Sequence, residues 1–235
     1  IMCSHFLSKK CTLKLVKPFR PLRAIHKILS IGFGSSLLDL STVMLAIILN
    51  NQIMYYGGTA ALSVYGIVGT ISSLFQALFC GVGQAVQPLA SANYGAKKMD
   101  RTQAVLRMAM ITSIIMGVIF TIVGQAFPGQ IVRLFTDATP EVLGVAPIII
   151  RGYFIVFLFL GINVLATYFL QSTMHGHLSA VIAILRGFVL STIFLYALPL
   201  ALKLSGVCIA MPVSECLTAV IALVLIYKPS TKKMA

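Results

Sequence analysis

The sequence is poor in charged residues and poorest in acidic ones. Only 10% of its 235 residues are charged, and five of them are Asp or Glu, whereas a soluble globular chain carries roughly 25% charged residues. Hydrophobic residues make up 59% of the chain, so too few polar side chains remain to cover a surface that faces water. These proportions exclude an ordinary soluble domain. They suit a membrane protein with spans of about 20 residues each.

Patterns typical of enzymes, metal sites and disulfide frameworks are also missing. The five cysteines form no CxxC pair and no Cys/His ligand spacing, which argues against a zinc site or a disulfide framework. No Ser, His and acidic residues converge at a catalytic spacing, and no Gly-rich loop would cradle a phosphate. His175 and His177 flank a glycine, but further ligands do not cluster near them. We therefore expect neither an enzyme nor a bound cofactor or metal.

Long apolar runs are abundant instead, and they predict six membrane-spanning helices. Backbone groups inside a bilayer must be hydrogen-bonded within the protein, which favours helices, and the polar/apolar alternation of a membrane β-barrel is absent. We expect an all-α polytopic membrane helix bundle. Its spans should cover residues 28–53, 60–87, 106–127, 145–170, 178–202 and 207–227.

These spans form one predicted transmembrane lobe, residues 28–227, between a basic cytoplasmic linker, 1–27, and a cytoplasmic tail, 228–235. Turns are expected at 55–59, 175–177 and 203–206, and a short amphipathic segment at 131–135. The second span should end at Pro88, because proline lacks the backbone N–H that continues a helix.

The net charge of +13 also arises mostly outside the spans. With six spans, fourteen of the eighteen Lys and Arg residues lie on one side of the membrane, and Arg133 and Lys203 lie on the other. Because basic loops stay in the cytoplasm, both termini are predicted to be cytoplasmic. Basic residues placed in this way indicate membrane orientation rather than nucleic-acid binding. We expect a multi-pass protein of the cell (plasma or inner) membrane.

Three charged residues lie well inside predicted spans, where charge is costly and often functional. Asp39 and Glu215 are near the middle of the first and sixth spans, and Arg186 lies about eight residues into the fifth. Asp39 is a candidate site for Na⁺ or H⁺, against the alternative of a structural hydrogen bond. Arg186 reaches a depth where it could meet Glu215, and for this pair a structural role and a role in transport are both open.

Polar but uncharged residues occur in or at the ends of the spans, among them Gln84, Gln87 and Gln171. Gln84 is a candidate contact for an ion or a substrate in a water-filled cavity, although hydrogen bonding between helices is the alternative for each such residue. Arg151, close to the end of the fourth span, is expected to reach the membrane interface.

The segment from Gly81 to Lys98 reads GVGQAVQPLASANYGAKK, and it resembles a signature of the multidrug and toxic compound extrusion (MATE) family. The pattern of six spans, Asn50–Gln52, Leu160–Asn163, Gln171 and Arg186 are similar as well. The resemblance implies a transporter of two six-helix lobes around a central cavity, which exports organic cations and other amphiphiles in exchange for Na⁺ or H⁺.

By this resemblance the chain is the C-terminal lobe, and residues 1–27 match the linker from an N-terminal lobe, which agrees with the first residue being Ile1 rather than Met. Asp39 occupies a place where an acidic residue takes part in ion coupling in some members. Gly32–Gly34 stand where the family often has a proline. The expected partners are therefore small amphiphilic or cationic substrates, membrane lipid and the N-terminal lobe.

Alternating access needs two bundles that move about a central site, so we expect one lobe alone to transport nothing unless it pairs with another lobe or with itself. Two other functions stay open at this point. One is a membrane scaffold or assembly subunit whose buried charges are structural. The other is a flippase for lipid-linked sugars, which would need a larger and more basic cavity than Arg151 and Arg186 suggest.

Overall fold

The computed structural model describes the backbone of residues 21–136 and 139–231, and the side chains of residues 40, 43–136 and 139–226. The chain divides into two compact units, Ile1–Asp39 and Leu40–Ala235. The second unit holds all the side chains discussed below. The described backbone is helical throughout apart from short turns, which confirms the all-α prediction.

The helices follow one another in a simple order. They are α2 (Pro21–Gly95), α3 (Met99–Ala126), α4 (Pro128–Phe135), α5 (Pro140–Phe154), α6 (Phe157–Ser172), α7 (Gly176–Ile184), the π-helix η1 (Leu185–Val189) and α8 (Leu190–Thr231). The short α4 contains the amphipathic segment that the sequence predicted. Residues 21–27 of the predicted linker belong to α2, and residues 1–20 lie outside the described range.

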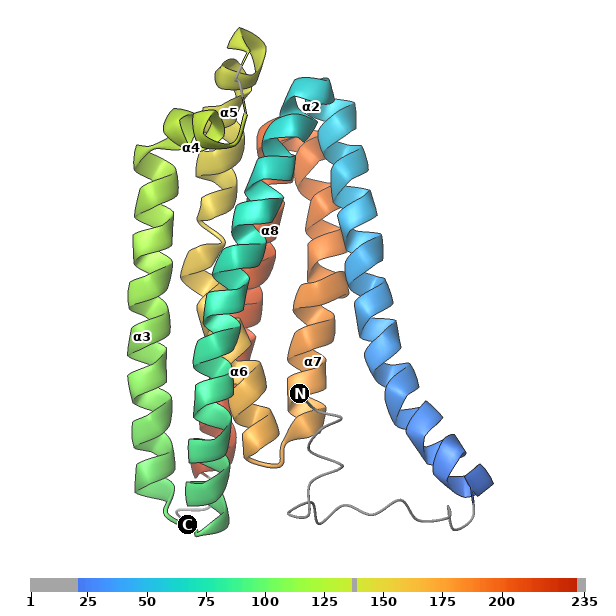
Figure 1. Ribbon diagram of the computed structural model, residues 1–235, viewed down its shortest axis with the longest axis vertical. Coiled ribbons are helices and arrows are strands. Elements are labelled where there is room, and N and C mark those ends of the chain that lie inside the picture. Colours follow the sequence, from blue (N-terminus) through green and yellow to red (C-terminus); the bar gives the residue numbers. More distant parts are fainter. Residues whose placement is uncertain (1–20, 137–138, 232–235) are drawn as a thin grey trace, which may run out of the picture. The chain divides into compact units, whose positions relative to one another are not determined.

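Four stretches of the described residues are long and apolar enough to cross a membrane, and two of them exceed 50 residues. Each of these two contains a non-helical residue where two helices meet, Gly58 in α2 and Lys203 in α8. Figure 1 shows the ribbon reversing its direction at both points. The two reversals confirm the turns predicted at 55–59 and 203–206. The number of spans and the cytoplasmic location of both ends stay predictions.

The prediction that a helix ends at Pro88 is wrong, because α2 continues to Gly95. What ends α2 is a Schellman motif, in which Lys97 has a φ of 58°. The Lys98 N–H donates to Asn93 O at 2.9 Å and the Lys97 N–H to Tyr94 O at 3.0 Å, the pair of bonds that defines this motif. A proline removes one backbone hydrogen bond and crowds the carbonyl four residues before it, which kinks some helices without ending them.

The fourth predicted span is not one continuous helix, because it breaks at Ile155–Val156 between α5 and α6. Neighbouring α3 supports the break: the Thr121 hydroxyl donates to the Phe154 carbonyl at 3.1 Å. Gly124 lets the Phe154 ring lie directly against α3, where a Cβ would overlap that ring. A backbone carbonyl released by the break is thus satisfied inside the protein, as a bilayer requires.

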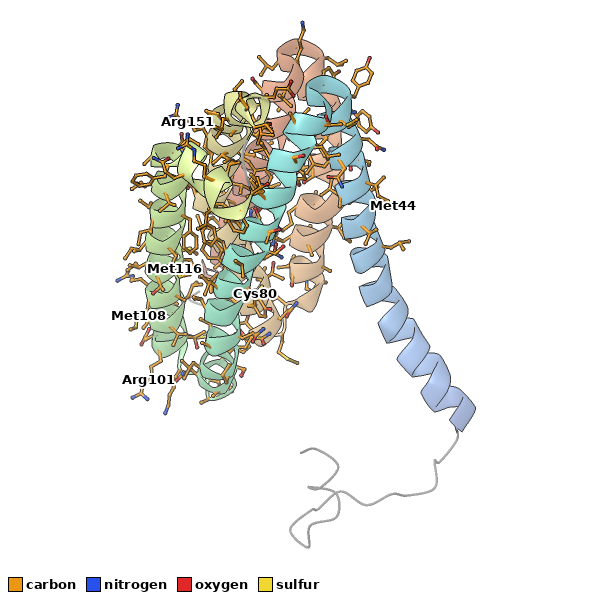
Figure 2. The ribbon with its side chains drawn as sticks, turned by 45° about the horizontal axis from the view of Figure 1, so that its top comes forward. Met44, Cys80, Arg101, Met108, Met116 and Arg151 are labelled. Carbon is orange, nitrogen blue, oxygen red and sulfur yellow. The ribbon has the colours of Figure 1, made fainter. Side chains whose placement is uncertain are left out.

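The outer face of α3 carries large apolar side chains. Met108, labelled in Figure 2, is 70% exposed, and Ile111, Ile115, Ile119 and Ile122 are exposed as well. In water so long an apolar surface would be unstable, but lipid solvates it. The core lies on the opposite side, where Phe75 and Phe120 stack with ring centroids 3.8 Å apart.

Candidate functional site

The mid-span charges Arg186 and Glu215 lie in contact, as their predicted depths suggested. Glu215, in the part of α8 after Lys203, is only 3% exposed. Arg186, in η1, donates from Nε and Nη2 to the same carboxylate oxygen, Oε1, at 3.0 and 2.8 Å. Two charge-assisted hydrogen bonds hold the pair together, and the two charges cancel. Since 18% of the Arg186 side chain is exposed, the guanidinium is the more accessible partner.

Asn163 of α6 holds the other side of Glu215. Its Nδ2 donates to the backbone oxygen of Glu215 at 2.9 Å and to the carboxylate Oε2 at 2.5 Å. Asn163 is completely buried, and its Oδ1 has no hydrogen-bond partner among the described residues. A buried polar atom without a partner is uncommon and calls for an explanation.

Arg186 lies in a local distortion of its helix. In η1 the backbone bonds run from residue i+5 to residue i, and the Leu190 N–H donates to Leu185 O. The Ser191 hydroxyl donates to the Arg186 carbonyl at 2.5 Å and lies 2.8 Å from the Ser214 hydroxyl. The backbone and the side chain of Arg186 are therefore both tied to the Ser214–Glu215 segment. Single π-turns of this kind are frequent at functional sites.

Two tyrosines join α5 to α2. Tyr153 lies at the end of α5, which also packs against α8. Its ring packs edge-on against Tyr65 of α2 with centroids 5.9 Å apart. Groups from α6 and η1 thus contact Glu215 of α8. We call Asn163, Arg186 and Glu215, with the Ser191–Ser214 pair, the Glu215 cluster.

Gln84 is not part of the Glu215 cluster. It lies on α2, where its side chain is exposed. With 100° per residue, Gln84 shares a face about 80° wide with exposed residues of small or polar type, among them Ser63, Gly66, Thr70 and Ser73. We call these five residues the α2 stripe. It contrasts with the apolar outer face of α3, and small and polar residues on membrane helices are typical of faces that pack against other helices.

Hydroxyls of the α2 stripe are satisfied within the helix. Ser63 donates to Thr59 O at 3.0 Å, Thr70 to Gly66 O at 3.1 Å and Ser73 to Gly69 O at 2.9 Å. The stripe is therefore stable without a partner and still offers lone pairs to a ligand. Three residues after Gln84 along α2, Gln87 Nε2 donates to Gln171 Oε1 at 3.3 Å, and this bond joins α2 to α6.

The remaining sequence candidates fall elsewhere. The side chain of Asp39 lies outside those that the structure describes, so its proposed role stays a prediction. Arg151 is exposed and donates to Gln125 O at 3.2 Å, and Figure 2 shows it at the opposite end of the helices from Arg101. Among the described residues, no three His, Cys, Asp or Glu side chains gather in a way that could hold a metal ion.

Sequence reasoning missed the contribution of Asn163 as a partner of Glu215, and it missed Ser191 and Ser214. Asn163 had been noted only within a family-like segment, although an amide in the middle of an otherwise apolar run is itself a signal of a buried polar contact. The two serines gave no such signal, because serine is common in membrane helices of every kind.

The fold and the site define a polytopic helical membrane protein with a buried polar cluster and a polar helix face. The MatE family profile matches residues 35–197, and the chain belongs to that family.

Curated relatives support this assignment. The chain is 29% identical over 218 residues to the multidrug export protein MepA of Staphylococcus aureus (strain NCTC 8325 / PS 47), covering 92% of this chain and 46% of that protein. It is 27% identical to MepA of Staphylococcus haemolyticus (strain JCSC1435), over 95% of this chain and 49% of the relative. The chain spans about half the length of the curated relatives it matches.

Solved structures share the fold. A multidrug resistance MATE family transporter of the MOP superfamily in its outward-facing conformation aligns with a TM-score of 0.82 at 20% identity, over 98% of this chain and 52% of that one. A MOP superfamily transporter from Pyrococcus furiosus aligns with a TM-score of 0.79 at 19% identity, over 95% of this chain and 51% of the other. The fold is therefore that of one half of a MATE transporter.

Proposed function

We propose that the chain is the C-terminal lobe of a secondary active exporter, which expels organic cations and other amphiphilic compounds in exchange for Na⁺ or H⁺. The observation that carries this proposal is the α2 stripe, a polar face on a helix long enough to cross the membrane. A second lobe placed opposite this face would enclose a polar cavity between the two halves, as in two-bundle transporters. Family membership and the half-length match to multidrug export proteins support the same function.

Within this proposal the polar and charged groups have separate roles. Gln84 and the other residues of the α2 stripe contact the substrate from one side of the cavity. Asp39, the other acidic residue inside a predicted span, exchanges the coupling ion, because a carboxylate in a membrane can bind H⁺ or Na⁺ in one conformation and release it in another. Glu215 and Arg186 neutralise each other, so they attract a substrate cation less than a lone carboxylate would.

The test uses the longest open reading frame that contains this sequence, expressed in a host without major efflux pumps. Export of a fluorescent organic cation from everted vesicles is measured under an imposed Na⁺ gradient and, separately, under an imposed pH gradient. We expect export under one gradient, and Asp39→Asn should reduce it at least tenfold at an unchanged amount of protein in the membrane. The matched control is Asp100→Asn in the exposed first turn of α3, which should export normally.

A scaffold or assembly subunit is the second candidate, and the satisfied Arg186–Glu215 pair favours it, because such a pair can be purely structural. Under this alternative, export is absent or Asp39→Asn lowers it only as far as it lowers the protein level. Robust export by the isolated 235-residue chain would contradict the half-transporter proposal in a different way, since one lobe would then be sufficient.

A further inference from the structure

Helix α4 carries an apolar side that the described residues cover only in part. With 100° per residue, its apolar residues fill an arc of about 160°, in the order Leu134, Ile131, Phe135, Pro128 and Val132 around the helix. Pro128 and Val132, at one end of this arc, are buried. Leu134, at the other end, is 82% exposed. Arg133 lies opposite the middle of the arc and is exposed, so α4 has a polar side and an uncovered apolar edge.

A single residue joins α3 to α4 and sets the direction of α4. The Phe127 N–H donates to Val123 O at 3.0 Å, as it would inside α3, and its own carbonyl already accepts from the Ile131 N–H at 3.0 Å. Pro128 follows as the first residue of α4, where its ring fixes a helical φ. No flexible linker separates the two helices, so α4 starts at the depth where α3 ends. It lies across that end rather than extending it (Figure 1).

The length of α3 places this end in the headgroup layer of the membrane. Its 28 residues span about 42 Å at 1.5 Å per residue, and a bilayer with its headgroups is roughly 40–45 Å thick. With Arg101, in the first turn of α3, in one headgroup layer, Phe127 lies in the other. Phe127 is 51% exposed, and it continues the apolar outer face of α3 toward α4.

The charged residues near α4 agree with this depth. Gln125, in the last turn of α3, and Arg151 of α5 are joined by two bonds: Gln125 Nε2 donates to Arg151 O at 2.7 Å, and Arg151 Nε donates to Gln125 O at 3.2 Å. These bonds hold the exposed Arg151 side chain level with the end of α3. Glu141 lies ten residues earlier in α5, which is about 15 Å further out along the helix. Arginines thus lie at the level of α4, and the acidic residue of α5 lies beyond it.

We propose that α4 is an anchor in the membrane interface, whose uncovered apolar edge inserts among lipid acyl chains while two arginines bind lipid phosphates. The edge consists of Phe127, Leu134 and Phe135, and the arginines are Arg133 and Arg151. Amphipathic helices with Phe and Leu on one side and basic residues on the other lie in this layer. Lipid is the occupant rather than a second protein, because the edge continues the lipid-facing surface of α3. The proposal goes beyond the proposed exporter and does not depend on transport.

The chain contains no tryptophan, so a single introduced tryptophan reports on its own surroundings. Leu134→Trp is reconstituted in phosphatidylcholine/phosphatidylglycerol vesicles whose acyl chains carry bromine, a quencher of tryptophan fluorescence, either near the headgroup or near the chain end. We expect bromine near the headgroup to quench Leu134→Trp about threefold more strongly than Gln130→Trp, on the exposed polar side of α4. Iodide in the water should quench the two variants in the opposite order.

Two further tryptophan positions check the measurement. Met108→Trp, on the outer face of α3 and 70% exposed, should be quenched most by bromine near the chain end. Phe127→Trp is an independent reporter for the edge and should behave as Leu134→Trp does, even if one of these two variants cannot be reconstituted. All these side chains are exposed, so tryptophan displaces no core residue at any of them.

A charge reversal tests the arginine. In the Leu134→Trp background, Arg133→Glu should lower quenching by bromine near the headgroup about twofold, because lipid phosphates attract a guanidinium and repel a carboxylate. Arg101→Glu, at the other end of α3, should leave the quenching unchanged. Equal quenching in these two variants would overturn the assignment of Arg133 to lipid phosphates.

The anchor would be overturned if iodide quenched Leu134→Trp as strongly as Gln130→Trp, because the edge would then face water. It would equally be overturned if neither bromine nor iodide quenched Leu134→Trp. In that case another protein surface, such as a second copy of the chain, would cover the edge. Failure of export in vesicles would instead count against the proposed function alone.

Discussion

Removal of the Arg186 guanidinium should be among the most damaging single changes in this protein. Arg186→Met keeps most of the side-chain volume but leaves the Glu215 carboxylate, 3% exposed, without its two hydrogen bonds from arginine. Breaking a buried ion pair on one side costs about 3–5 kcal/mol. Because the Arg186 side chain is 18% exposed, water replaces part of the lost contact, and we expect the lower end, about 3 kcal/mol.

The double variant Arg186→Met/Glu215→Leu removes both charges together. Replacing a buried pair by apolar residues of similar size is often neutral or stabilising, so this variant should regain most of the stability that Arg186→Met loses. The Asn163 amide would then keep only its bond to the backbone oxygen of residue 215, which sets a residual loss of about 1 kcal/mol.

Reversible unfolding in mixed micelles of increasing dodecyl sulfate content, followed by circular dichroism, measures these differences. Arg151→Met is the matched control, because Arg151 is exposed and donates only to a backbone carbonyl of α3; it should cost less than about 1 kcal/mol. The reasoning is refuted if Arg186→Met costs no more than Arg151→Met, or if the double variant is as unstable as the single one.

Two further pairs of substitutions test the packing around the site by the same unfolding measurement. Ser191→Ala should cost about 1 kcal/mol, because it removes the hydroxyl that joins Arg186 to Ser214. Ser113→Ala should be neutral or slightly stabilising, because the buried Ser113 hydroxyl has no partner among the described residues. Equal effects of the two substitutions on stability would contradict this account. Gly124→Ala should cost about 1–3 kcal/mol, because the new methyl group would overlap a phenyl ring of α5. Its control is Gly144→Ala in α5, where the added methyl group meets open space and should stabilise the protein by up to about 1 kcal/mol. If Gly124→Ala is tolerated, α3 and α5 are less tightly packed than described.

Much of the fold could be predicted from the sequence, because the hydropathy of a segment indicates whether it lies in lipid or in water. Long apolar runs must be helices in a bilayer, and Gly58 and Lys203 lie inside short polar intervals that can only be turns. The helix end beyond Pro88 and the break at Ile155–Val156 could not be predicted in this way. Both depend on hydrogen bonds supplied by distant or capping groups, such as Thr121 to Phe154 O, which composition does not reveal.

The candidate site was predictable only for its charged members. A charge in an apolar run must find a partner, and Arg186 and Glu215 could be paired from depth alone. Asn163 reports nothing about its partner, since an amide can bond to many groups at a modest energy of about 1 kcal/mol. Gln84 was identified as a polar residue in a span, but its place on a continuous polar face emerged only when exposure was known for its neighbours on α2.

The Glu215 cluster and the α2 stripe differ in what they require from a second lobe. Among the described residues, every buried polar side-chain atom of the Glu215 cluster except Asn163 Oδ1 is satisfied inside the chain, so the cluster needs no second lobe to satisfy its other polar groups. The α2 stripe satisfies its hydroxyls too, but it leaves a polar surface that lipid cannot solvate well. A second lobe is therefore needed for the surface that would meet a substrate and not for the Glu215 cluster.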